Sequence, residues 1–81
     1  MRNLIKETVG SVNYDLFEEQ IETDGEQRTA YGITVSDSCE TVDIHDVSTV
    51  QEKASMIFET MIRNFVTPVH AKYIVEDMLA C

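Results

Sequence analysis

The stretch SVNYDLFEEQIETDGEQRTAYGITVS, residues 11–36, decides the fold of this chain. Apolar and polar residues alternate on both sides of Asp24-Gly25, as they do in half-buried strands. Asp-Gly between two such segments favours a two-residue hairpin loop, because both central residues of that turn need a positive φ. The sequence therefore predicts two antiparallel strands joined at this dipeptide.

The two-residue loop also determines which residues of the hairpin lie opposite each other. Counting back from the turn places Leu16 opposite Ile33 and Tyr14 opposite Val35. These four apolar side chains then share one face of the sheet, although the turn prediction makes no use of their positions. We therefore expect this face to be the core side of the hairpin.

The other face of the hairpin also carries apolar residues. The same register places Phe17 across from Gly32, where an aromatic ring can lie over the bare glycine backbone. Ile21 and Ala30 share this face with Phe17. The hairpin is therefore expected to present apolar side chains on both of its sides.

A third strand and a helix follow the hairpin. Val42 and Ile44 alternate with polar residues, and the short polar connection before them favours an antiparallel neighbour. We expect Ser48 to be the N-cap of a helix over Ser48–Phe65, with Gln51 completing a capping box. The strand is then expected to end where the helix begins.

Two amphipathic helices complete the chain, because apolar residues recur at three- and four-residue spacing in both segments. The apolar face of the first helix consists of Val50, Ala54, Ile57, Phe58, Met61 and Phe65. Pro68 suits the first position of the second helix, since proline lacks the amide that a helix interior needs. The apolar face of this helix consists of Ala71, Ile74, Val75, Met78 and Leu79, and the residues pointing nearly the opposite way are Val69 and Tyr73.

This order of elements predicts an α+β fold, with a three-stranded antiparallel meander followed by two helices packed on one sheet face. At 81 residues the chain has the length of one small domain. Residues 1–10 are interpreted as either an extra strand or a flexible arm, because their pattern is ambiguous.

The charge of the chain is strongly negative and unevenly distributed. Fifteen acidic and six basic residues give a net charge of -9, of which residues 1–48 carry -8. Such a surface is repelled by phosphate groups, so nucleic acid and anionic membranes are not expected as partners. A partner is instead expected to be another protein or a second copy of the chain.

The compartment follows from the cysteines and the hydropathy. Cys39 and Cys81 do not form the dense framework that staples small secreted domains, so we interpret both as free thiols. No apolar stretch is long enough for export or for spanning a bilayer. The sequence therefore predicts a cytoplasmic protein.

Few residues of the chain suggest chemistry. Asp43 and His45 lie on one side of the third strand, and with His70 they are the candidates for a metal site. Metal sites need three or four ligands, and nothing indicates that His70 converges with the other two. We therefore favour a solvated strand face for His45 and a capping role for His70, and expect no catalytic residue and no cofactor.

Short motifs of the chain resemble a family of small uncharacterised proteins from clostridial Gram-positive bacteria. The motifs are Tyr31-Gly32-Ile33, Asp46-Val47-Ser48, Pro68-Val69-His70 and Val75–Leu79, within a stretch from about Tyr14 to Leu79. The resemblance implies a cytosolic bacterial domain, and the family is one of unknown function. It therefore implies no activity.

The favoured hypothesis is a non-enzymatic protein–protein interaction module that forms a homodimer. Two helices can cover only one face of a sheet, so some apolar residues are left over for contact with a partner. These interface candidates are Phe17, Ile21, Ala30, Val69 and Tyr73. An alternative is a protein that binds a small ligand or a divalent metal near His45 and His70, and a weaker one is an acidic decoy of nucleic acid.

Overall fold

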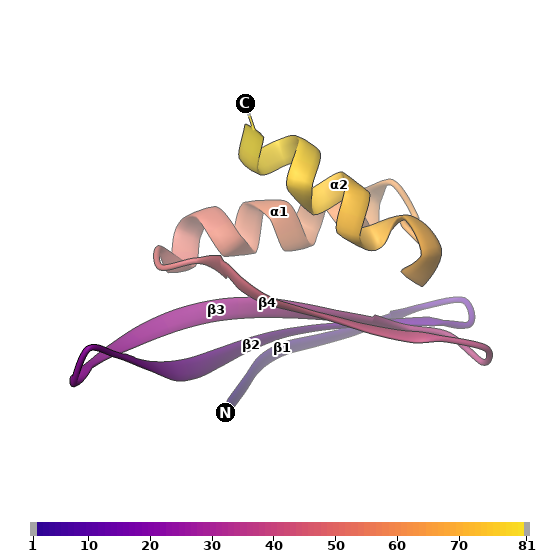
Figure 1. The fold of residues 1–81 in the computed structure, drawn as a ribbon. Helices are drawn as coiled ribbons and strands as arrows, with labels where there is room; N and C mark the ends of the chain where they lie inside the picture. The colour runs from indigo at the N-terminus through magenta and orange to yellow at the C-terminus, as the bar shows by residue number, and fades with distance from the viewer. Residues whose placement is uncertain (1, 81) are drawn as a thin grey trace.

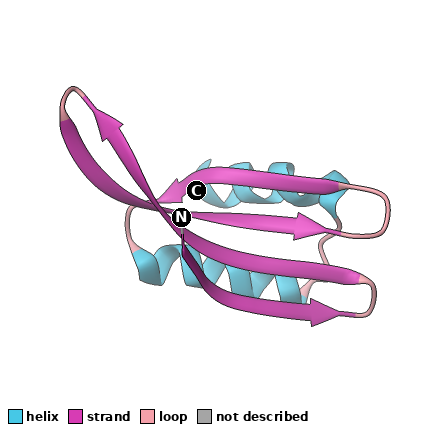
Figure 2. Ribbon diagram, turned by 90° about the horizontal axis from the view of Figure 1, so that it is seen from below, coloured by secondary structure: helices cyan, strands magenta, loops and turns pink. Residues whose placement is uncertain are grey.

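The computed structural model describes residues 2–80, which form one antiparallel sheet and two helices (Figure 1). The elements are β1 (Arg2–Val9), β2 (Val12–Thr23), β3 (Glu26–Ser36), β4 (Thr41–Ser48), α1 (Gln51–Arg63) and α2 (Pro68–Ala80). The strands lie in the order β1-β2-β3-β4, and both helices lie on one face of the sheet. The other face is open, as Figure 2 shows from below. The fold is therefore a two-layer α+β arrangement.

The prediction of a three-stranded sheet is wrong, because Arg2–Val9 add a fourth strand that pairs with β2. The pairing passes from Asn3 opposite Phe17 to Ile5 opposite Leu16, so Leu4 is an extra residue that forms a bulge. A bulge interrupts the two-residue period by which strands are recognised in a sequence. The strand pattern of β1 is weak for this reason.

The predicted register of the hairpin is confirmed. Leu16 pairs with Ile33 and Tyr14 with Val35, and these four side chains are fully buried on the helix side of the sheet. The two loop residues, Asp24-Gly25, have φ values of 53° and 80°, as the turn requires. The turn residues and the alternation of apolar side chains thus fix the register of the two strands that contribute these four side chains to the core.

The core lies between the sheet and the helices. Its buried helix residues are Ala54, Ile57, Phe58, Met61, Ala71 and Val75. The Tyr14 hydroxyl donates a hydrogen bond of 2.8 Å to the backbone carbonyl of Val66, in the connection between the helices. Burial raises the pKa of Tyr14 above its usual value. This bond joins the central part of the sheet to the loop that connects α1 and α2.

The predicted start of the first helix is wrong. Helix α1 begins at Gln51, and its N-cap is Val50, which makes no side-chain capping hydrogen bond. Ser48 belongs to β4, where it pairs with Tyr31, and its hydroxyl accepts a hydrogen bond from the Val50 amide. Pairing with β3 therefore extends the strand through the residue that the sequence suggests as a cap, and no capping box forms.

The apolar face of α1 is shorter than predicted, because its two terminal members are exposed. Val50 is 54% exposed and Phe65 is 66% exposed, whereas the four residues between them are buried. Phe65 follows the end of the helix and has a φ of 52°. Helix α2 begins at Pro68, as predicted. The ends of α1 thus add apolar surface instead of core.

Candidate functional site

Large apolar side chains that are exposed gather on the helix layer. In the described part of the chain they are Ile5, Val50, Met56, Phe65, Val69, Tyr73 and Leu79. All but Ile5 belong to the helices or to the segments that flank them. Exposed apolar side chains that share one layer of a small domain can form a contact site for a partner. The helix layer is therefore the first candidate surface.

The interface candidates from the sequence fall into two groups. Val69 and Tyr73 are 59% and 70% exposed on α2. Phe17 is only 2% exposed and Ala30 is fully buried, while Ile21 is half-buried. The structure thus exposes the candidates on the helix and leaves little accessible surface on two of the three candidates in the hairpin.

Phe17 is covered by its own chain. Its ring lies directly over Gly32. A Cβ atom at position 32 would overlap the ring. The imidazole of His45 packs edge-on against it, with ring centroids 5.5 Å apart. Phe17 on the open sheet face is therefore already packed within one molecule.

His45 is held on this open face by a carboxylate. Its Nδ1 atom lies 3.1 Å from Glu19 Oε2, and the side chains of these residues are 59% and 19% exposed. Asp43 accepts a hydrogen bond of 2.7 Å from the Thr34 hydroxyl. Both candidates for metal binding on β4 thus have partners on other strands, Asp43 on the adjacent β3 and His45 on β2.

His70 lies in the first turn of α2, on the other side of the sheet from His45. The structure therefore does not bring Asp43, His45 and His70 together. Across residues 2–80, no group of three or more His, Cys, Asp or Glu side chains is placed to hold a metal ion. The alternative of a ligand site near the two histidines gains no support from this geometry.

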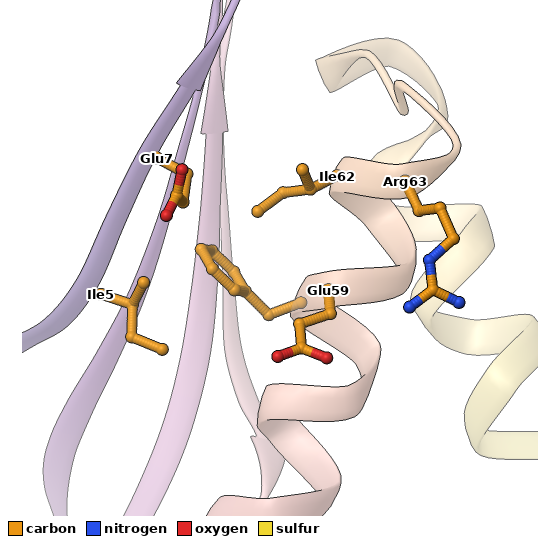
Figure 3. A pocket seen from close by; sticks show the side chains of 6 residues that line it. Ile5, Glu7, Glu59, Ile62 and Arg63 are labelled. Atoms are coloured by element: carbon orange, nitrogen blue, oxygen red, sulfur yellow. The ribbon is translucent and has the colours of Figure 1, made fainter.

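A second candidate surface is a groove between β1 and α1 (Figure 3). Helix α1 packs mainly over β2, β3 and β4, so β1 lies at the margin of the helix layer. The groove has a volume of about 450 Å³, and it is lined by Ile5, Glu7, Phe58, Glu59, Ile62 and Arg63. Two of its lining residues, Ile5 and Glu7, belong to β1, which is an edge strand of the sheet.

The groove combines an apolar floor with acidic rims. Figure 3 shows Ile5 and Ile62 pointing into it from β1 and α1, with the carboxylates of Glu7 and Glu59 beside them. Arg63 extends to the other side of α1, away from Glu7. Neither carboxylate forms an ion pair with another of the residues described by the structure. The groove thus presents apolar contacts and two acidic side chains against one basic side chain.

A second hollow lies between the helices. It has a volume of about 320 Å³ and is lined by Lys53, Met56, Ile57, Thr60 and Met78. Methionine side chains are flexible and are common on surfaces that adapt to partners. Met56 belongs both to this hollow and to the exposed apolar side chains of the helix layer.

The groove residues Ile5 and Glu7 were not among the candidates from the sequence. The available signal was the ambiguous pattern of residues 1–10, which allows a strand. Nothing in that pattern shows that α1 leaves the strand uncovered, because this depends on where the helix packs on the sheet.

Comparisons with known proteins identify a family and no activity. No helix within residues 2–80 has the length and apolar character needed to cross a membrane. Searches of the curated proteins and of the solved structures found no match to the chain. The model of a family of unknown function, DUF6514, matches residues 2–81. Since this match spans nearly the whole sequence, the chain belongs to the DUF6514 family.

Proposed function

We propose that this protein is a non-enzymatic protein–protein interaction module that forms a homodimer through its helix layer. The observation that carries the proposal is the separation of apolar surface from charge. Nearly all exposed large apolar side chains of the described residues lie in or beside α1 and α2. Residues 49–81, which contain these helices, carry a net charge of only -1.

The charge distribution favours the helix layer over the sheet as a contact between copies. Residues 1–48, which form the sheet, carry a net charge of -8. Two such surfaces repel each other, since like charges that lose water on contact are strongly unfavourable. A second copy of the chain therefore approaches with its helices toward the helices of the first.

The size of the molecule is consistent with this role. A standard interface buries about 800 Å² per partner, which is roughly one seventh of the 5275 Å² surface of this chain. A domain of 81 residues is near the size at which association adds substantially to a small core. The homodimer thus supplies apolar burial that one copy leaves incomplete.

The proposal also places the protein in the cytoplasm of a bacterium. Cys39 is an exposed free thiol, which suits a reducing compartment. The resemblance to clostridial proteins supports the same location.

Sedimentation velocity at micromolar concentration tests the homodimer. We expect the wild type to sediment as a dimer and the double variant Val69→Asp/Tyr73→Asp to sediment as a folded monomer, because two carboxylates would be desolvated at the contact. The control is Gln27→Asp/Thr29→Asp, which adds the same charge to the hairpin and is expected to remain dimeric. Circular dichroism confirms that each variant is folded. A wild type that stays monomeric, or a dimer that tolerates Val69→Asp/Tyr73→Asp, would overturn the proposal.

A further inference from the structure

The outer edge of β1 has no strand beside it. In the order β1-β2-β3-β4, this strand pairs only with β2, so part of its backbone N–H and C=O groups face outward. From Ile5 to Val9 the pairing with β2 is regular, residue by residue. This regular stretch is long enough to template an added strand by backbone hydrogen bonds.

The other edge of the sheet is less suitable. The regular pairing of β4 with β3 covers only Thr41 to Ile44, and a register shift follows it. Helix α2 also packs against β4, whereas the groove described above lies over β1. The edge of β1 is therefore the one that offers both free backbone and room for side chains.

A strand added beside β1 would direct alternate side chains toward the groove. Neighbouring strands lie about 4.8 Å apart, so these side chains would stand next to Ile5 and Glu7, which point to the helix side. The residue opposite Ile5 would meet the apolar floor formed with Phe58 and Ile62. The residue opposite Glu7, two positions away, would meet the acidic rim.

The charge of the groove selects the occupant. Glu7 and Glu59 have no ion-pair partner among residues 2–80, and the whole chain carries -9. A lysine or arginine can lay its apolar stem on the groove floor and bring its charge to these carboxylates. A second copy of β1 is a poor occupant, because the helix-side residues of its regular stretch, Ile5, Glu7 and Val9, include one acid and no base.

We propose that the edge of β1 binds an extended segment of another protein as a fifth strand, with an apolar residue and a basic residue two positions apart facing the groove. The open side of the added strand would carry polar residues, since Lys6 faces that side of the sheet opposite Asp15. Lys6 also discourages unspecific pairing, because an edge lysine must be matched by the incoming strand. The site uses residues of α1 beside β1, and none of these is among the exposed apolar side chains of the helix layer.

This proposal is tested with a capped nine-residue peptide. In this peptide, threonine alternates with valine, arginine, valine and arginine. The protein is the full chain carrying Val69→Asp/Tyr73→Asp and, in parallel, the wild type, so that binding is measured independently of the homodimer. Amide chemical shifts are expected to change at residues 5–9 and 58–63 on titration. The same peptide N-methylated at alternate residues is expected not to bind, since it lacks the ladder donors. Absence of shifts at β1, or equal binding of the N-methylated peptide, would overturn the proposal.

Matched variants separate the groove from general attraction between opposite charges. Glu7→Gln/Glu59→Gln is expected to weaken peptide binding about tenfold. The control Glu22→Gln/Glu26→Gln, on the hairpin, makes the same change in net charge. It is expected to change the affinity for the peptide less than about twofold. Equal weakening by both pairs would show unspecific attraction. Concentration-dependent shifts at β1 without peptide would show a second copy in the site. Either result would contradict the proposed partner.

Discussion

Tyr14 is the residue that ties the two layers together. Its side chain is fully buried in the core, and its hydroxyl donates to the Val66 carbonyl across 52 positions of sequence. A buried carbonyl that loses its donor keeps its desolvation cost without compensation. The contribution of this tyrosine to stability is therefore larger than that of its ring alone.

We expect Tyr14→Phe to lower the free energy of unfolding by about 1–2 kcal/mol at neutral pH, because the Val66 carbonyl is left without its donor. The effect is expected to depend on pH. Burial raises the pKa of Tyr14, so above its ordinary value near 10 the unfolded chain loses the proton first, and wild-type stability falls as the pH rises further. The difference between wild type and variant should therefore narrow at alkaline pH.

Urea denaturation at neutral pH and at several values above 10 measures this effect. The control is Tyr31→Phe, since the Tyr31 hydroxyl makes no hydrogen bond with another described residue. Equal destabilisation by both variants would contradict the role of the hydrogen bond. A gap between wild type and Tyr14→Phe that widens with pH would contradict the direction of the pKa shift.

At the scale of elements, close packing around Gly32 holds β2, β3 and β4 together on the open face. The Phe17 ring of β2 crosses Gly32 of β3 and meets His45 of β4. A Cβ atom at position 32 would overlap the ring and lie 2.6 Å from the backbone oxygen of Ile44. The three strands can therefore approach as they do because position 32 has no side chain.

We expect Gly32→Ala to destabilise the protein by about 1–3 kcal/mol, as overpacking of a filled site does. Thermal unfolding of the variant measures the loss. Gly32→Ala is expected to lower stability less when Phe17 is already replaced by leucine than when it is introduced into the wild type. The smaller side chain of Phe17→Leu leaves room for the methyl group. Additive losses would show that the ring is not the main obstacle.

For the molecule as a whole, the excess of negative charge and most of the exposed large apolar side chains lie in different layers. Figure 2 shows the β2–β3 hairpin projecting beyond the helices, and the sheet-forming residues carry most of the acidic charge. In the proposed homodimer, contact through the helix layer would bring two chains of net charge -9 together mainly by apolar burial. The long-range electrostatic contribution to dimer formation is then repulsive.

Salt is therefore expected to strengthen the homodimer and to weaken peptide binding at β1. Raising the ionic strength shortens the Debye length to about 8 Å at 0.15 M, which screens repulsion between the copies and attraction of a basic peptide alike. Sedimentation velocity and peptide titration at low and physiological salt measure the two effects. A dimer that dissociates with added salt would indicate an interface held by ion pairs and not by the apolar helix surface.

The sequence by itself determined the β2–β3 hairpin and its register. Asp24-Gly25 and the alternation around it are local, so the pairing of Leu16 with Ile33 needs no knowledge of the rest of the chain. The start of α2 at Pro68 is local in the same way. These features follow from backbone preferences of a few neighbouring residues.

Only the tertiary structure decided how these elements cover one another. The bulge at Leu4 hides the period of β1, and pairing with Tyr31 keeps Ser48 in a strand. The burial of Phe17 depends on His45, and the groove depends on α1 packing away from β1. Such features depend on contacts between residues far apart in sequence, and neither turn chemistry nor periodicity carries information about them.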